Sequence, residues 1–123
     1  MNVIAAVVLI LLVQSAAWAG GDIDAGKVLF DRRCSNCHRV GTPYSGFGPQ
    51  LTGIFGRQAG SLDDYQYSTA MKASGITWNR ETLSAFLKDP EAVVPQSKMR
   101  FWGLGDAQDI EDLLSYLRSF ESR

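Results

Sequence analysis

The stretch RRCSNCHRV, residues 32–40, sets two cysteines three positions apart and a histidine directly behind the second cysteine. Cys34, Cys37 and His38 are also the only cysteines and the only histidine in the chain. Cys-x-x-Cys-His is the sequence signature of covalent haem attachment. The spacing suits that chemistry, because residues i and i+3 on a helical turn project to the same side and can reach two neighbouring vinyl groups of one porphyrin. The imidazole of His38 can then bind the iron from that side.

Three other uses of these cysteines fit the sequence less well. A disulfide between Cys34 and Cys37 would close a very small ring and would constrain little of the unfolded chain. Zinc takes four ligands, and the chain has no second cysteine pair and no further histidine. A thioredoxin-like dithiol belongs to an α/β pattern, which this sequence lacks. The sequence therefore predicts one haem c, attached through Cys34 and Cys37, with His38 as an axial ligand.

The second axial position of the iron is open to several ligands. Because the chain has a single histidine, bis-histidine coordination is excluded, and methionine, lysine, water or an open site remain. Met71 lies on an amphipathic stretch and suits a role in core packing. Met99 lies in an irregular loop between Pro95 and Gly103, where no helix face is available to it. Since thioether sulfur is a soft ligand, we favour Met99 over Met71.

The first 19 residues have the pattern of a secretory signal peptide. An unbroken apolar run from Val3 to Val13 is followed by Ala17-Trp18-Ala19, a small-x-small cleavage pattern in front of Gly20. The run is shorter than the roughly 20 residues that span a bilayer. We therefore expect export to the periplasm and a mature domain at residues 20–123. An uncleaved anchor on the outer face of the inner membrane is the alternative.

Charge is nearly balanced in the rest of the chain. The 12 basic and 13 acidic side chains all follow Gly21, and the net charge is −1. This balance argues against nucleic acid as the main partner. The carboxylates are scattered along predicted helix termini, so no acid–base pair for catalysis is evident. We therefore expect neither enzyme activity nor a small-molecule substrate.

Apolar periodicity predicts an all-α domain with three to five short helices, long loops and no convincing strand. The expected helices lie within residues 21–34, 63–74, 77–90 and 106–120. Residues 40–62 and 91–105 are expected to be loops, and Pro90 is expected to stop the helix before it. So long a loop in so small a domain makes sense if the chain wraps a large cofactor. We therefore expect the chain without haem to be largely disordered.

The predicted helices carry recognisable caps and apolar faces. Thr77 or Asn79 can cap one helix and Asp106 another, and Gly26 permits close contact between the first helix and a second element. The apolar face of the first helix is expected to consist of Ile23, Val28, Leu29 and Phe30. The faces of the two later helices are expected to consist of Leu83, Phe86 and Leu87 and of Ile110, Leu113, Leu114, Leu117 and Phe120.

Four segments in this order resemble class I cytochrome c, particularly its mitochondrial and photosynthetic-bacterial branch. They are CSNCH, GPQLTGIFGR, ITWNRETLSAFLKDP and VPQSKMRFWGL. The similarity runs through nearly all of residues 21–120. It implies a cytochrome c fold wrapped around one covalently bound haem c, with His38 and Met99 as the axial ligands of the iron.

The same resemblance implies roles for further residues. The carbonyl of Pro49 would accept the ring N–H of His38, which orients that ligand. Phe101 would lie beside the exposed haem edge. Hydrogen bonds to a buried haem propionate are implied for Arg57, Tyr67 and Trp78. The resemblance also implies that Gly26 and Phe30 cross the last helix at Leu113 and Tyr116.

The sequence departs from the family pattern in two regions. Phe86 stands where tyrosine is usual and Met71 where a polar residue is usual, which makes this side of the haem drier. Of the lysine ring around the haem edge only Arg33 and Lys98 remain. Glu91 and Asp106 stand where lysines would be expected. We therefore expect a partner with a less acidic docking surface.

Filled axial positions leave no place for a substrate at the iron. The predicted function is that of a soluble, monomeric one-electron carrier, which docks transiently on respiratory or other periplasmic redox partners. One alternative is a haem enzyme, or a sensor that binds peroxide or a small gas through a labile sixth position. Another is a dedicated cytochrome subunit of a periplasmic dehydrogenase.

Overall fold

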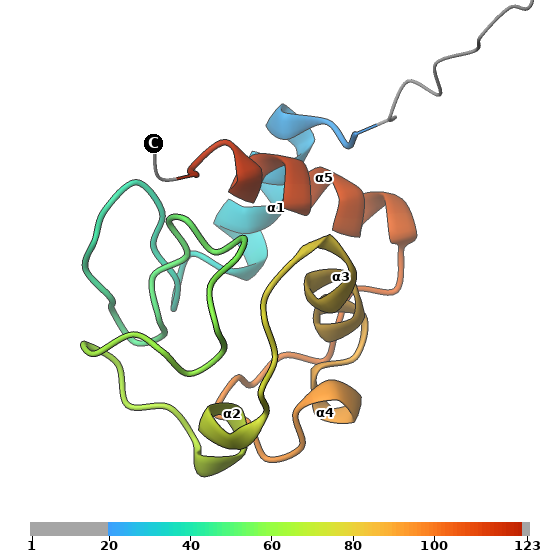
Figure 1. The fold of residues 1–123 in the computed structure, drawn as a ribbon. Helices are drawn as coiled ribbons and strands as arrows, with labels where there is room; N and C mark the ends of the chain where they lie inside the picture. Colours follow the sequence, from blue (N-terminus) through green and yellow to red (C-terminus); the bar gives the residue numbers. More distant parts are fainter. Residues whose placement is uncertain (1–19, 122–123) are drawn as a thin grey trace, which may run out of the picture.

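The computed structural model describes residues 20–121, which fold into five helices joined by long loops (Figure 1). The helices are α1 (Ile23–Arg33), α2 (Thr69–Ala73), α3 (Arg80–Lys88), α4 (Pro90–Val93) and α5 (Ala107–Arg118). Over that range the only β pairing is an isolated bridge between Gln58 and Thr77. The prediction of an all-α fold with short helices and long loops is confirmed. The predicted signal peptide, residues 1–19, lies outside the described residues.

Helices α1 and α5 cross at close range near the two chain ends (Figure 1). A Cβ atom on Gly26 of α1 would lie only 2.0 Å from the backbone oxygen of Asp112 in α5. One turn further along, the rings of Phe30 and Tyr116 pack with centroids 5.4 Å apart. The backbone N–H of Asp22 donates to the Asp112 carboxylate at 2.8 Å, which ties the start of α1 to α5. The close contact predicted for Gly26 is therefore confirmed.

The apolar face predicted for α1 is wrong in two of its members. Ile23 and Val28 are 50% and 49% exposed, whereas the buried residues of this helix are Gly26 and Phe30. The buried strip of α1 is the one that carries Gly26 and Phe30 and faces α5. Leu29 packs against the core while partly exposed.

Helix α3 begins with a capping box. The Asn79 side chain accepts the backbone N–H of Thr82 at 2.9 Å, and the Thr82 hydroxyl accepts the backbone N–H of Asn79 at 2.9 Å. Asn79 is thus the N-cap, and Thr77 instead pairs with Gln58. Leu83, Phe86 and Leu87 are buried, as predicted.

Replacing Asn79 with alanine removes the acceptor for one of the first backbone N–H groups of α3. We expect the free energy of unfolding of the haem-loaded protein to fall by about 1 kcal/mol, as is typical for loss of an N-cap. Chemical denaturation followed by circular dichroism measures this change. Asn79→Ser is the matched control and should stay near wild type, because serine caps nearly as well. Equal stability of Asn79→Ala and wild type would show that the box contributes nothing.

The prediction that residues 91–105 form one loop is wrong at its start. Pro90 ends α3, as expected, but it also opens the short helix α4. Proline is tolerated at a first helical position, because the N–H that it lacks would be unpaired there. Asp89 follows α3 and caps α4, since its carboxylate accepts the backbone N–H of Ala92 at 3.2 Å.

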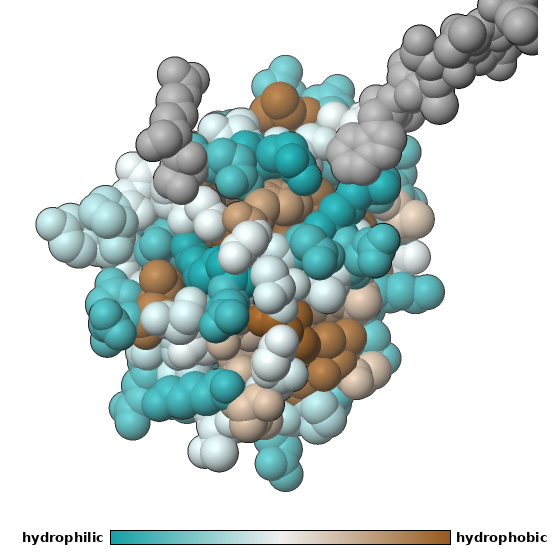
Figure 2. Space-filling view, viewed as in Figure 1, coloured by the Kyte–Doolittle hydropathy of each residue, from teal (hydrophilic) through white to brown (hydrophobic). Residues whose placement is uncertain are grey.

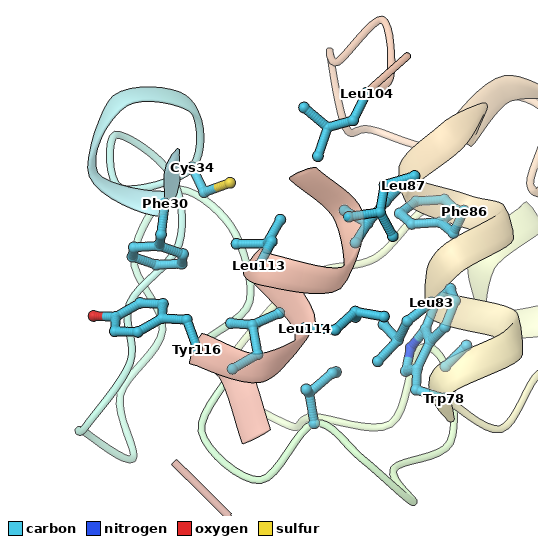
Figure 3. Close-up of a cluster of buried hydrophobic side chains, with 14 of the residues drawn as sticks. Phe30, Cys34, Trp78, Leu83, Phe86, Leu87, Leu104, Leu113, Leu114 and Tyr116 are labelled. Carbon is cyan, nitrogen blue, oxygen red and sulfur yellow. The ribbon is translucent and has the colours of Figure 1, made fainter. Parts of the chain in front are cut away.

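Helix α5 supplies much of the core. Its N-cap is Asp106, whose carboxylate accepts the backbone N–H groups of Gln108 and Asp109, as predicted. The buried apolar residues of α5 are Ile110, Leu113, Leu114, Tyr116 and Leu117. In Figure 3, Leu113 and Leu114 stand between the side chains of α1 and those of α3. Phe120 is half-buried and lies beyond the last helical residue, Arg118.

The helix expected within residues 63–74 is shorter in the structure than predicted. Helix α2 starts only after Ser68, whose hydroxyl accepts the backbone N–H of Met71 at 3.1 Å. Residues 40–62 form a loop region, as predicted.

Hydrophilic side chains cover most of the face in Figure 2, and hydrophobic ones reach the surface in the region of α3 and α4. Within residues 20–121, none of the helices has both the length and the apolar character that crossing a bilayer requires.

Candidate functional site

A cavity of about 300 Å³ opens between α1, α2, α3 and α5 and the loops that join them. This volume lies in the range of ligand pockets, and most of its lining side chains are hydrophobic. Every site residue predicted from the sequence lines this one cavity. They are Cys34, Cys37, His38, Pro49, Arg57, Tyr67, Trp78, Met99 and Phe101.

The two cysteines lie on a turn that continues α1. The backbone N–H groups of Cys37 and His38 both donate to the carbonyl of Cys34, at 3.1 and 2.9 Å. Both thiols are free, with Cys34 buried and Cys37 exposed. Burial raises the pKa of the Cys34 thiol to about 11, so it is protonated at neutral pH. A redox dithiol needs a lowered pKa for its attacking cysteine, and Cys34 has the opposite shift.

His38 is held in one tautomer. Its Nδ1 lies 2.8 Å from the carbonyl oxygen of Pro49, and because a carbonyl only accepts, Nδ1 must carry the proton. Burial lowers the pKa of His38, which keeps the ring neutral at neutral pH, and the Pro49 bond opposes this shift only in part. The lone pair of Nε2 is therefore available, as a metal-binding imidazole requires. Gly48 makes room for this ring, because a Cβ atom there would lie 3.0 Å from His38 Cε1.

Two thioether side chains line the cavity. Met71 comes from α2, where its backbone N–H is bonded to Ser68 and its carbonyl to the Ser74 hydroxyl. Met99 comes from the loop after α4 and follows Lys98, whose Nζ donates to the carbonyl of Gln66 at 2.6 Å. The structure therefore offers two soft sulfur atoms to a group bound in the cavity.

The cavity wall near the 50–57 loop carries a positive charge. The Arg57 guanidinium donates to the carbonyls of Gln50 and Thr52, both at 2.6 Å, which fixes its position. Burial lowers the pKa of Arg57, while Tyr67 and Asp64 act in the opposite direction. Arginine stays protonated under such a shift. Tyr67 lines the cavity as well, so an anionic group there would meet a fixed cation and a phenol.

Apolar side chains complete the wall around Trp78. The ring of Phe86 packs on Trp78 with centroids 5.1 Å apart, and both residues are buried. The backbone N–H of Trp78 donates to the carbonyl of Arg57 at 2.8 Å, which couples this wall to the charged one. Phe86 and Met71, which are expected to make one side of the site drier, both line this cavity.

The lining includes residues that the sequence did not point to. Tyr65 stacks edge-on against Tyr67 with centroids 4.8 Å apart, and Phe47 lines the cavity while 89% exposed. Ser68, Leu51 and Ile54 also contribute. Among these residues only Tyr65 has a sequence signal for a place in the lining, which is its alternation with the predicted Tyr67. The others lie in loops without periodicity.

This set of side chains fits a haem. Two thiols on one turn, a neutral imidazole with its Nε2 lone pair free, two thioethers and the half-buried Arg57 surround a space whose walls are mostly apolar. Each group matches a need of that cofactor: two covalent anchors, two axial ligands, a counter-charge for a carboxylate and apolar walls for the porphyrin.

Comparison with known proteins agrees with this geometry. Residues 23–121 match the family described as "Cytochrome c". The chain is 45% identical to "Cytochrome c" of Gibberella zeae over 101 residues, which is 81% of this chain and 95% of that protein. It is 43% identical to "Cytochrome c2" of Rhodomicrobium vannielii, over 87% of this chain and 86% of the relative. Among solved structures, cytochrome cH from Methylobacterium extorquens has a TM-score of 0.75 at 39% identity, and the match covers 80% of this chain and 99% of that one.

Proposed function

Since this chain belongs to the cytochrome c family and is a one-electron carrier with one covalently attached haem c, we propose that Cys34 and Cys37 form its two thioether bonds and that His38 and Met99 are its axial ligands. The haem iron supplies the one-electron couple when bound. The observation that carries the assignment is the meeting of all these side chains on one cavity, with the His38 tautomer set by Pro49.

The protein side chains act on the haem by binding and shielding it. His38 and Met99 are neutral ligands, and thioether sulfur favours the reduced state over the oxidised one. Arg57, Tyr67 and Trp78 line the cavity and would hold a propionate carboxylate there. With His38 and Met99 as the two ligands, both axial positions would be filled, which would leave no place for peroxide, a gas or another substrate. We therefore assign no catalytic role, and the haem enzyme and the sensor are disfavoured.

Electrons pass where the cavity meets solvent. Cys37 is exposed and Phe101 half-buried, and both line the cavity. A partner that approaches this opening reaches the shortest path to the bound group. We propose transient docking there by a monomer, as small redox contacts are weak and quickly released. A permanent dehydrogenase subunit would need a large apolar interface, and native gel filtration separates the two cases.

The place of action follows from the N-terminal segment and the family. We propose that residues 1–19 direct export, that residues 20–123 form the working domain, and that electron transfer takes place in the periplasm. If the segment stays attached, the same domain would work at the outer face of the inner membrane. The size of the purified secreted protein distinguishes the two outcomes.

The choice between Met99 and Met71 has a direct spectroscopic test. Met99→Ala should abolish the weak near-infrared band of the sulfur–iron bond, and the reduced variant should bind carbon monoxide readily at neutral pH. The reason is that removing the sixth ligand opens one axial position. Met71→Ala is the matched control, since it removes a thioether from the same cavity and should leave the band in place. Loss of the band in Met71→Ala, with retention in Met99→Ala, would reverse the assignment.

A further inference from the structure

Two strongly exposed aromatic side chains of this protein lie on loop segments that help to line the cavity. Among residues 20–121, Trp102 is 100% exposed, Phe47 89% and Tyr44 70%, and no other large hydrophobic side chain exceeds 50%. Phe47 lines the cavity, and Trp102 directly follows Phe101, which lines it too. Exposed aromatic side chains near a functional opening indicate an interaction surface, because aromatic residues are enriched at protein interfaces relative to the rest of the surface.

Trp102 is presented on a fixed backbone. A Cβ atom on Gly103 would lie 2.2 Å from the carbonyl oxygen of Lys88, so the chain passes directly against the end of α3. The backbone N–H of the buried Leu104 donates to the carbonyl of Leu87 at 2.8 Å. On the other side, the Phe101 ring lies under the Arg33 guanidinium, 5.4 Å from its centroid. Because the backbone on both sides is already held, a partner that covers Trp102 has to order its side chain but not the loop that carries it.

The charged side chains that line the cavity are all cationic. Arg33, Lys98 and Arg100 line the cavity together with the inner Arg57, and no aspartate or glutamate of the described chain does so. Two of the outer cations already have partners, since Arg33 lies over Phe101 and Lys98 donates to Gln66. The opening therefore favours carboxylates on a partner, but with few cations to pair them.

We propose that Trp102 anchors the redox partner by inserting into an apolar pocket on that protein, with a sparse rim of partner carboxylates facing Arg33, Lys98 and Arg100. The inference rests on the electron-carrier function and names the chemistry of the partner's docking face. Tryptophan and arginine are the residues that most often dominate binding at interfaces. In this proposal Trp102 determines the affinity for the partner, and the cations determine the rate of association.

Oxidation of the reduced holoprotein by a purified cytochrome c oxidase tests this proposal. Trp102→Ala should raise the KM of the oxidase for this protein about tenfold or more at every ionic strength, because truncating a central tryptophan typically has this effect. The kcat at saturation should not change. Arg100→Gln should instead flatten the salt dependence of the reaction, because it removes one rim charge. Tyr44→Ala, an exposed aromatic outside the cavity lining, is the control and should match wild type.

Oxidation by ferricyanide, a small ion that needs no docking pocket, separates the proposed role of Trp102 from the electron-carrier function. Trp102→Ala should react with ferricyanide at the wild-type rate. A wild-type KM for Trp102→Ala with the oxidase overturns the anchor, and so does a wild-type protein that ferricyanide oxidises while the oxidase does not. Failure of the wild-type holoprotein with both oxidants contradicts the electron-carrier function itself.

Discussion

Replacing both Cys34 and Cys37 with alanine is expected to give a chain that carries no haem and does not unfold cooperatively. The cavity of about 300 Å³ lies among the side chains that make up the core, including Phe30, Leu83 and Leu113. At roughly 24 cal/mol per Å³ of cavity, an unfilled space of that size costs about 7 kcal/mol. Small domains have a total stability of about 5–15 kcal/mol, so the loss removes between about half of it and all of it.

The measurement is the intact mass of the secreted protein together with thermal melting followed by far-ultraviolet circular dichroism. Asn36→Ala changes the same turn, keeps Cys-x-x-Cys-His intact and should retain both the haem and the transition. A sharp, reversible melt of the double variant, with no porphyrin in its mass, would show that the chain folds around something other than the cofactor. Single variants should keep one thioether and fall between the two.

The cofactor site was largely predictable because its chemistry is local. Cys34, Cys37 and His38 lie within five consecutive positions, and the helical turn that their spacing implies is the turn that the backbone makes. The bond from His38 to Pro49 joins residues only 11 positions apart, and it followed from the family resemblance. Sequence could also place α3 and α5, since each has an N-cap and a clear apolar stripe.

Other parts of the fold depend on contacts that no local pattern encodes. The two guanidinium bonds of Arg57 go to carbonyls of a loop without periodicity. The sequence pattern does not predict helix α4, because Pro90 indicates the end of the preceding helix, although proline also suits the first position of a helix. The exposure of Ile23 and Val28 reflects how closely α1 meets α5, which is a property of the pair and of neither helix alone.

The contact between α1 and α5 predicts a large effect for a very small change. In Gly26→Ala, the added methyl group would lie 2.0 Å from the Asp112 carbonyl oxygen and 2.8 Å from the Tyr116 Cβ. The first of these atoms is backbone, so the helices must move apart, and the Asp22–Asp112 bond and the Phe30–Tyr116 ring contact would lengthen with them.

We expect Gly26→Ala to lower the free energy of unfolding of the haem-loaded protein by about 2–3 kcal/mol, although alanine is intrinsically the better helix former by about 1 kcal/mol. Guanidinium chloride titration measures the loss. Gly105→Ala is the matched control, because nothing lies within 4 Å of a Cβ atom there, and its stability should stay within about 0.5 kcal/mol of wild type. If Gly26→Ala is as stable as Gly105→Ala, then the helices can separate at little cost. The close contact between α1 and α5 would then contribute little to the free energy of unfolding.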